Sequence, residues 1–357
     1  MRLTMCLLVV LIHAGLAASA EPDRARRIEL VADGTGSSGR EPRVTSPFGV
    51  SFDGAGTLYF VEMVGNRVRK LGADGLVTTL AGTGQKGDTG DDGPAVDAQF
   101  NGPHSLAVFA NGDILIADTW NNRVRKIDAR SGRISNVAGT GEKGYSGDGG
   151  PATKAKFGGI YCLALDEANG TLDLDDLDNR RVRRVDLKTG IVTTVAGNGK
   201  KGVPADGADA AQAPLVDPRA VTIDGRGNLY ILERGGNALR VVNGAGKIRT
   251  VVGTGKPGHS GDGGDGRKAT LNGPKHLCVD RDGNVLIADT ENHCIRMYRP
   301  GDGTIQAIAG NGRKGTKGVG GPPLEAEFNQ PHGVTVGPGS VLYISDSSND
   351  RILKIVP

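Results

Sequence analysis

The chain has few cysteines, few aromatic residues and almost no excess of either charge. Of its four cysteines, Cys6 lies in an N-terminal apolar run, which leaves Cys162, Cys278 and Cys294. An odd number does not make a disulfide framework, and a chain of 357 residues can bury an adequate core without one. With 43 basic and 40 acidic residues, the net charge of +3 argues against a nucleic-acid partner.

Long apolar runs are also missing, apart from one at the N-terminus. Arg2 supplies a positive start, residues 6–16 are apolar but too short for a stable membrane anchor, and residues 18–20 read Ala-Ser-Ala. This pattern predicts a secretory signal peptide over residues 1–20, cleaved near Ala20, and a mature domain over residues 21–357. We expect a secreted or periplasmic, soluble monomer with no membrane span.

Glycine, by contrast, is abundant, with 58 of 357 residues, and it recurs at fixed places between β-branched runs, where tight turns need positive φ. One pattern is repeated six times along the chain. The copies are separated by 56, 56, 59, 56 and 57 residues and begin at Pro47, Pro103, Gly159, Pro218, Pro274 and Pro331. Such a regular repeat decides the fold before any single residue is interpreted.

Within one repeat the apolar period is two, which is typical of strands. In the second copy, residues 106–108, 114–116, 124–127 and 134–137 are expected to be four short strands. Asn111-Gly112 is a hairpin signal between the first two, and Asn121-Asn122 marks the next turn. Four antiparallel strands per unit predict a propeller blade.

The sixth copy ends at Pro357 after only three strands. Residues 27–36 (RIELVADGTG) match the fourth-strand pattern of residues 77–84 (VTTLAGTG). A strand from one end of the chain can therefore complete the last blade and remove its exposed edge. We predict an all-β fold, a six-bladed β-propeller of four-stranded blades closed by the N-terminal strand.

The repeat pattern P-x-x-[LV]-x-[VI]-D…G-x-[LV]-[YL]-[IV]-A-D-T-x-N-[NH]-R-[VI]-[RK] resembles the NHL repeat. The tail AGTGEKGYSGDGGPATKAKF resembles the long-looped bacterial and teneurin-like variety of that repeat. The resemblance covers essentially the whole mature chain and implies a six-bladed propeller. It does not imply one function, because the family includes enzymes, RNA binders and extracellular recognition modules.

An acidic residue closes the second strand of every repeat. The six acids are Glu62, Asp118, Asp176, Glu233, Asp289 and Asp346. Five positions later, four repeats carry an arginine and two carry Ala238 and Cys294 instead. These arginines are Arg67, Arg123, Arg181 and Arg351. We expect a structural role, in which the acid caps the turn and pairs with the arginine that follows it.

Loops rich in aspartate and glycine follow three of the repeats, at residues 87–95, 145–152 and 259–266. Carboxylates on a flexible loop suit calcium, but the alternating ligand pattern of an EF-hand is absent. A turn followed by a short helix, with Pro-Ala at its start, is the interpretation we favour.

The repeats differ most where the first strand begins. The opening Pro or Gly is followed by Phe48, His104, Ile160, Arg219, Lys275 and His332, with Tyr161 and His276 next along. The first strand of a blade is innermost, so these residues crowd the mouth of the central channel. We predict a ligand site there, formed by Phe48, His104, Tyr161, Arg219, Lys275, His276 and His332. No catalytic residue is identified.

The segments GPHSLAV and QPHGVTV resemble the Pro-His segments of peptidylglycine amidating lyases, which are also six-bladed. In that family such histidines bind zinc from alternate blades. The resemblance implies a divalent metal at His104 and His332, with zinc or calcium as the candidate ions, and it places Arg219 where a third ligand would be expected.

Two functions from different classes follow. The first is a secreted binding or recognition module that uses one face of the disc to hold a protein, a glycan or a small molecule. The alternative is a metal-assisted enzyme, lyase-like or lactonase-like, with its site at the channel mouth. An enzyme needs polar groups that converge in one pocket, whereas a module needs only an exposed patch.

Overall fold

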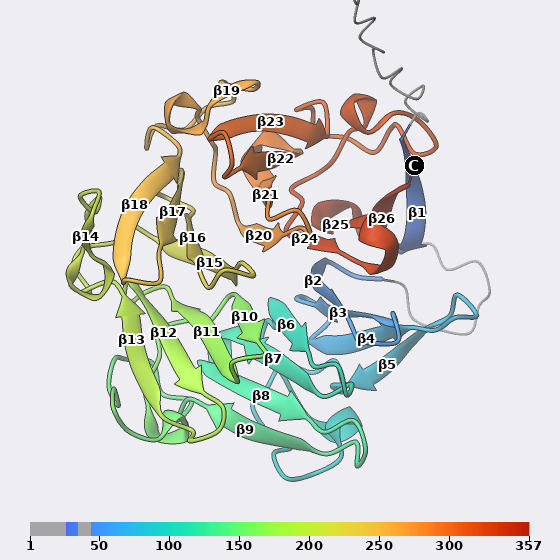
Figure 1. The fold of residues 1–357 in the computed structure, drawn as a ribbon. Helices are drawn as coiled ribbons and strands as arrows, with labels where there is room; N and C mark the ends of the chain where they lie inside the picture. Colours follow the sequence, from blue (N-terminus) through green and yellow to red (C-terminus); the bar gives the residue numbers. More distant parts are fainter. Residues whose placement is uncertain (1–25, 35–43, 357) are drawn as a thin grey trace, which may run out of the picture.

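The computed structural model describes residues 26–34 and 44–356. These residues form six antiparallel sheets arranged as blades around a common centre (Figure 1). The predicted six-bladed β-propeller is therefore confirmed. The signal peptide predicted for residues 1–20 lies outside the described residues, and within the described part no helix has the length and apolar character needed to cross a membrane.

The first three blades contain four strands each, in chain order from the centre outward. Blade 1 consists of β2 (Pro47–Phe52), β3 (Leu58–Glu62), β4 (Arg67–Leu71) and β5 (Val77–Ala81). Blade 2 consists of β6 (Ser105–Val108), β7 (Ile114–Asp118), β8 (Arg123–Ile127) and β9 (Ile134–Ala138). Blade 3 consists of β10 (Leu163–Asp166), β11 (Thr171–Asp176), β12 (Arg181–Asp186) and β13 (Val192–Ala196).

Blades 4 and 5 each gain a two-residue outer strand. Blade 4 consists of β15 (Pro218–Ile223), β16 (Leu229–Glu233), β17 (Ala238–Val242), β18 (Lys247–Val252) and the added β14 (Ala208–Asp209). Blade 5 consists of β20 (His276–Val279), β21 (Val285–Asp289), β22 (Cys294–Arg299), β23 (Thr304–Ala309) and the added β19 (Gly264–Asp265). Blade 6 consists of β24 (Gly333–Val336), β25 (Leu342–Asp346), β26 (Arg351–Val356) and β1 (Arg27–Asp33).

Short 3₁₀ helices fill the connections. Those between blades are η1 (Ala95–Asp97), η3 (Ala152–Lys154), η4 (Ala210–Gln212), η5 (Gly266–Lys268) and η7 (Pro323–Glu325). Those within blades are η2 (Thr119–Asn121), η6 (Thr290–Asn292), η8 (Pro338–Ser340) and η9 (Ser347–Asn349). The predicted turn and short helix after the Asp-Gly loops is confirmed, with Pro94 and Pro151 immediately before η1 and η3.

The ring is closed by its two ends. In Figure 1, β1 in dark blue lies along β26 in red. The two strands are antiparallel, with Ile28 opposite Ile355, and Ile28 is fully buried in the core of blade 6. Ile28 also exchanges two backbone hydrogen bonds with Gly320 and Gly321 in the preceding loop. The predicted closing strand is thus confirmed, apart from residues 35 and 36, which lie outside the described residues.

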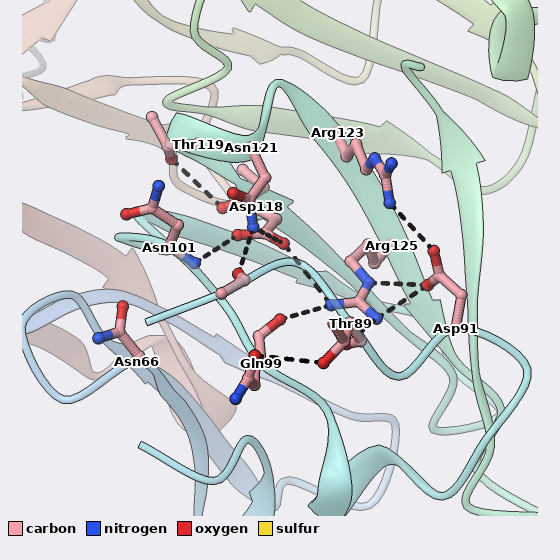
Figure 2. Close-up of polar contacts among 12 residues, drawn as sticks. Asn66, Thr89, Asp91, Gln99, Asn101, Asp118, Thr119, Asn121, Arg123 and Arg125 are labelled. Atoms are coloured by element: carbon pink, nitrogen blue, oxygen red, sulfur yellow. Dashed lines mark hydrogen bonds and ion pairs between the residues drawn. The ribbon is translucent and has the colours of Figure 1, made fainter. Parts of the chain in front are cut away.

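A buried arginine joins blades 2, 3 and 5 to the loop before each of them. Figure 2 shows Arg125 of β8, fully buried between Asp118 of its own blade and Asp91 of the preceding loop. Its nitrogens lie 2.8 Å from Asp91 and 3.6 Å from Asp118, and they donate to the carbonyl oxygens of Gln99 and Thr89. One side chain therefore satisfies acceptors from two repeats at once.

The pairing predicted for Arg67, Arg123 and Arg181 is wrong. The acid that ends the second strand pairs instead with an arginine two residues further along the third strand. The observed pairs, with distances of 2.6 to 3.9 Å, are Arg69–Glu62, Arg125–Asp118, Arg183–Asp176, Arg240–Glu233 and Arg296–Asp289. Ala238 and Cys294 therefore remove nothing from the network. In blades 2, 3 and 5 this arginine also donates to backbone carbonyl groups of the incoming segment, which favours it over the arginine two residues earlier.

Blade 6 keeps the network by a substitution of its own. Leu353 stands where the other blades have the buried arginine, and Arg351 reaches Asp346 at 2.7 Å instead. Arg351 also donates to the carbonyl oxygens of Thr316 and Glu327, in the segment that enters the blade. The predicted pairing is correct for this one arginine.

We predict that the chain needs β1 to stay folded. A chain that starts at residue 44 should lose thermal stability or aggregate, because β26 would expose its backbone donors and acceptors at a sheet edge. A chain that starts at residue 26 keeps β1 and serves as the control. Thermal unfolding followed by circular dichroism measures both, and equal melting temperatures would contradict the closure.

Candidate functional site

The first strands of all six blades surround the centre of the ring (Figure 1). Residues at their starting ends contact one another across the mouth of the channel. Phe48 stacks on His332 with ring centroids 4.2 Å apart and meets the edge of His104 at 4.9 Å. His104 in turn meets Tyr161 at 4.8 Å, and the guanidinium of Arg219 lies 4.2 Å from the Tyr161 ring. Blades 6, 1, 2, 3 and 4 are thus linked in order.

Both mouth histidines are held in one orientation by the backbone. Nδ1 of His104 donates to the carbonyl of Gly102 at 2.7 Å, and Nδ1 of His332 donates to the carbonyl of Gln330 at 2.8 Å. Burial, with the positive charge of Arg219, lowers the pKa of His104 to about 3. Burial, with the charges of Lys275 and Arg219, also holds the pKa of His332 well below its ordinary value. At neutral pH both rings are neutral, with Nε2 as an acceptor.

Arg219 is the unusual member of this group. Its side chain is 4% exposed, its Nε has no hydrogen-bond partner, and no carboxylate of residues 26–34 or 44–356 lies within 4.0 Å of its guanidinium. Burial lowers the pKa of Arg219, and the carboxyl group of Asp175 opposes that shift. A buried guanidinium that lacks a partner is costly, so this residue needs an explanation beyond folding.

Asp175 is the nearest acid, but it is committed elsewhere. Its Oδ1 accepts from the backbone N–H groups of Tyr161 and Cys162 at 2.8 and 2.6 Å, and its buried Oδ2 has no partner. Burial raises the pKa of Asp175 well above 3.8, against the opposing charge of Arg219. Asp173, two residues earlier in β11, is instead paired with Arg184 through two bonds of 2.7 Å.

The other two cations at the mouth have partners. Nζ of Lys275 lies 2.8 Å from Glu291, which also accepts a hydrogen bond from the side chain of Gln330. Arg234 lies 3.0 Å from Asp217. Burial lowers the pKa of Lys275, and the bond to Glu291 opposes this shift. Among these three cations of the described chain, Arg219 is therefore the one without a carboxylate within ion-pair distance.

His276 does not join the group that the sequence predicted. Its Nδ1 accepts from the backbone N–H of Val334 at 3.3 Å, and its side chain lines a cavity of about 310 Å³ along the central channel, beside Ser105, Cys162 and Cys278. Successive residues of a strand point to opposite faces, so the step from Lys275 to His276 turns the side chain away from the mouth. Burial, with the charge of Arg219, lowers its pKa to about 4.

The two mouth histidines do not complete a metal site by themselves. Phe48 contacts both rings, and no group of three or more His, Cys, Asp or Glu side chains able to hold a metal occurs among the described residues. Zinc sites in proteins use three or four protein ligands. These residues do not fit such a site, and the metal expected at His104 and His332 stays a prediction.

Reasoning from the sequence missed three members of the mouth. Asp175 breaks the apolar pattern of its strand, where blade 2 has Ala117, and that break was the available signal. Glu291 and Trp120 lie in the turns after second strands, at positions that vary without a pattern. Such residues can be assigned to the mouth only once the structure shows which first strand each turn lies beside.

Another cavity lies between blades 4 and 5. Its volume is about 590 Å³, and it is lined by hairpin turns at residues 224–228, 280–284 and 299–302, on the face opposite the mouth. The carboxylates of Asp224 and Asp280 there accept backbone N–H groups of their own turns. This face is built mainly from satisfied turns, so the mouth remains the stronger candidate.

Comparison with known proteins identifies the repeat. Residues 100–127 and 271–298 match the family model of the NHL repeat. NHL repeat-containing protein 2 of Homo sapiens is 26% identical over 291 residues, which cover 73% of this chain and 40% of the relative. The chain therefore carries NHL repeats within its six-bladed propeller. Teneurin-3 of Mus musculus is 25% identical over 318 residues, covering 78% of this chain and 11% of that protein, so the predicted teneurin-like resemblance is confirmed.

The NHL propeller spans less than half the length of the curated relatives it matches. Among solved structures, an auxiliary nutrient binding protein from Bacteroides thetaiotaomicron has a TM-score of 0.65 and 17% identity, over 93% of this chain and 76% of that one. A streptogramin B lyase has a TM-score of 0.53 and 14% identity, over 94% and 99%. These likenesses show the fold alone.

We predict that the buried histidines of the NHL propeller lower its stability as the pH falls from 7 to 4, whereas Asp118, Asp176 and Asp289, whose pKa values burial raises to about 6, act in the opposite direction. The folded protein keeps His104 and His276 neutral, with pKa values of about 3 and 4, whereas both gain protons below pH 6.5 in the unfolded chain. Stability present above pH 6.5 is therefore lost on acidification, by about 1.4 kcal/mol per pKa unit. In urea unfolding at several pH values, His104→Gln should show a shallower acid loss than the unchanged chain. If the free energy of unfolding falls with pH equally in both proteins, the contribution assigned to His104 is wrong.

Proposed function

We propose that this NHL propeller is a binding module that holds an anionic ligand, such as a carboxylate, at the mouth of its channel. The observation that carries the proposal is the buried guanidinium of Arg219, which has no counter-charge within ion-pair distance among the described residues. A guanidinium presents several N–H donors in a planar fork that matches a carboxylate.

Energetics support a ligand rather than a structural partner. Truncation of one partner of a buried ion pair usually costs about 3–5 kcal/mol, which measures how unfavourable an uncompensated buried charge is. The acid beside Arg219 relieves this little, because burial favours the neutral form of Asp175. A bound anion would supply the missing charge. Residues that serve binding at the expense of stability are common in functional sites.

The surroundings of Arg219 also suit a ligand. The neutral imidazoles of His104 and His332 do not repel or neutralise an anion, and they add acceptors for hydroxyl groups. Tyr161 holds the guanidinium plane by stacking at 4.2 Å. The nutrient binding proteins that share this fold are consistent with a binding role. Secretion of the chain stays a prediction from residues 1–20.

A metal-assisted enzyme at the same mouth is the second candidate. It is favoured by the fold shared with a streptogramin B lyase and with a putative gluconolactonase. The alternative predicts about one zinc ion per chain after exposure to zinc, lost in the double variant His104→Ala, His332→Ala. Elemental analysis of the purified protein measures this. The binding module predicts instead that carboxylate affinity survives treatment with a chelator.

We predict that Arg219→Met abolishes carboxylate binding and leaves the fold equally or more stable, by about 1 kcal/mol, because it removes an uncompensated buried charge. Calorimetric titration with succinate and with glucuronate measures binding, and urea unfolding measures stability. The matched control is Arg125→Met, which removes a buried and fully paired guanidinium and should cost about 3 kcal/mol or more. A loss of similar size for both variants would show that Arg219 is structural.

A further inference from the structure

The single tryptophan of the chain stands at the rim of the mouth. Trp120 lies in η2, is 49% exposed and meets the ring of His104 at a centroid distance of 5.5 Å. Single exposed apolar side chains are common on protein surfaces, but this indole stands beside a pocket lined by aromatic and polar side chains, as in many ligand sites. Its position is therefore informative.

The indole is held in place rather than free. A Cβ built on Gly102 would lie only 2.4 Å from the Trp120 ring, so the indole rests directly on the backbone of this glycine. The backbone N–H of Trp120 donates to the carbonyl of Asn101 at 3.1 Å. The carboxylate of Asp118, just before η2, also accepts the backbone N–H of Asn101 at 2.8 Å. A flat ring fixed in this way loses little entropy when a ligand stacks on it.

The mouth is divided into two halves. Aromatic rings come from blades 1 to 3, and cationic side chains come from blades 4 and 5. The aromatic half consists of Phe48, Trp120 and Tyr161, and the cationic half consists of Arg219, Arg234 and Lys275. His104 and Tyr161 stand between the exposed indole and the buried guanidinium. One small ring cannot contact both ends, so a ligand that uses both must extend across the rim.

We propose that the ligand is a short acidic oligosaccharide. One uronate residue places its carboxylate on Arg219, and a neighbouring sugar ring stacks on Trp120. This inference rests on the anion site of the proposed function and adds the class of ligand. The flat C–H face of a sugar ring packs well against an indole, while its hydroxyl groups keep their contact with water. Hydroxyl groups near the channel axis can donate to Nε2 of His104 and His332.

The chain reports directly on this contact, because Trp120 is its only tryptophan. The purified protein is titrated with trisaccharides of galacturonate, glucuronate and mannuronate while intrinsic fluorescence is recorded. At least one acidic trisaccharide should cause a saturable change. The matching neutral trisaccharide and the single uronic acid should each bind at least about tenfold more weakly, since each lacks one of the two contacts.

Calorimetry on variants separates the two contacts. Trp120→Ala should lower the affinity for the acidic trisaccharide about tenfold and leave the affinity for the single uronic acid unchanged. Trp120→Tyr keeps a flat ring and should show a smaller loss of affinity for the trisaccharide. Leu324→Ala removes another exposed apolar side chain, 54% exposed and far along the chain in η7, and is the control expected to change nothing. Urea unfolding checks that each variant is folded.

The outcomes distinguish the two proposals. If small carboxylates bind through Arg219 but no acidic trisaccharide binds more tightly than the single acid, the oligosaccharide inference is wrong and the anion site survives. Tighter binding of an aromatic acid such as phenylacetate than of any acidic trisaccharide would also overturn it. If no carboxylate binds at all, the proposed function itself fails.

Discussion

The arrangement of this propeller depends on an arginine buried between consecutive repeats. Blades pack through apolar faces, but the loops that enter blades 2, 3 and 5 also bring backbone carbonyl groups that need donors. Arg125 satisfies two such carbonyls and two carboxylates, and Arg183 and Arg296 repeat the arrangement in their blades. Because the acceptors come from the preceding repeat, the interaction fixes how blades follow one another. Blade 6 keeps it through Arg351, although its buried position is a leucine.

Arg219 gains its meaning from this comparison. It is buried like the structural arginines, with 4% exposure against 0% for Arg125, yet it lies on an innermost strand and has no acid within ion-pair distance in the described chain. The fold has the means to satisfy a buried guanidinium, since it does so for Arg125, Arg183 and Arg296. The channel mouth also carries neutral imidazoles and, at its rim, a fixed indole. An uncompensated guanidinium in this setting is best explained by a ligand that supplies the charge.

The repeated features of the sequence predicted the blades, whereas contacts made by residues outside the repeat pattern were missed. The 56-residue period and the unmatched strand at residues 27–36 were enough for the six blades and their closure. The divergent positions after each opening Pro were enough to predict that Phe48, His104 and Arg219 lie near one another at the channel mouth. The partner of Asp118 was misassigned, because the carbonyl groups that hold Arg125 belong to the preceding repeat. His276 was misplaced by a single residue, which on a strand reverses the side chain. Trp120 carried no repeat signal.

The central claim is that Arg219 binds an anionic ligand. The most direct measurement is a crystal structure of the protein grown with a uronic acid at neutral pH. The account predicts that carboxylate oxygens lie about 2.9 Å from the guanidinium nitrogens of Arg219, with Asp175 still bound to the N–H groups of Tyr161 and Cys162. A guanidinium that has turned to pair with Asp175, with no anion beside it, would contradict the account.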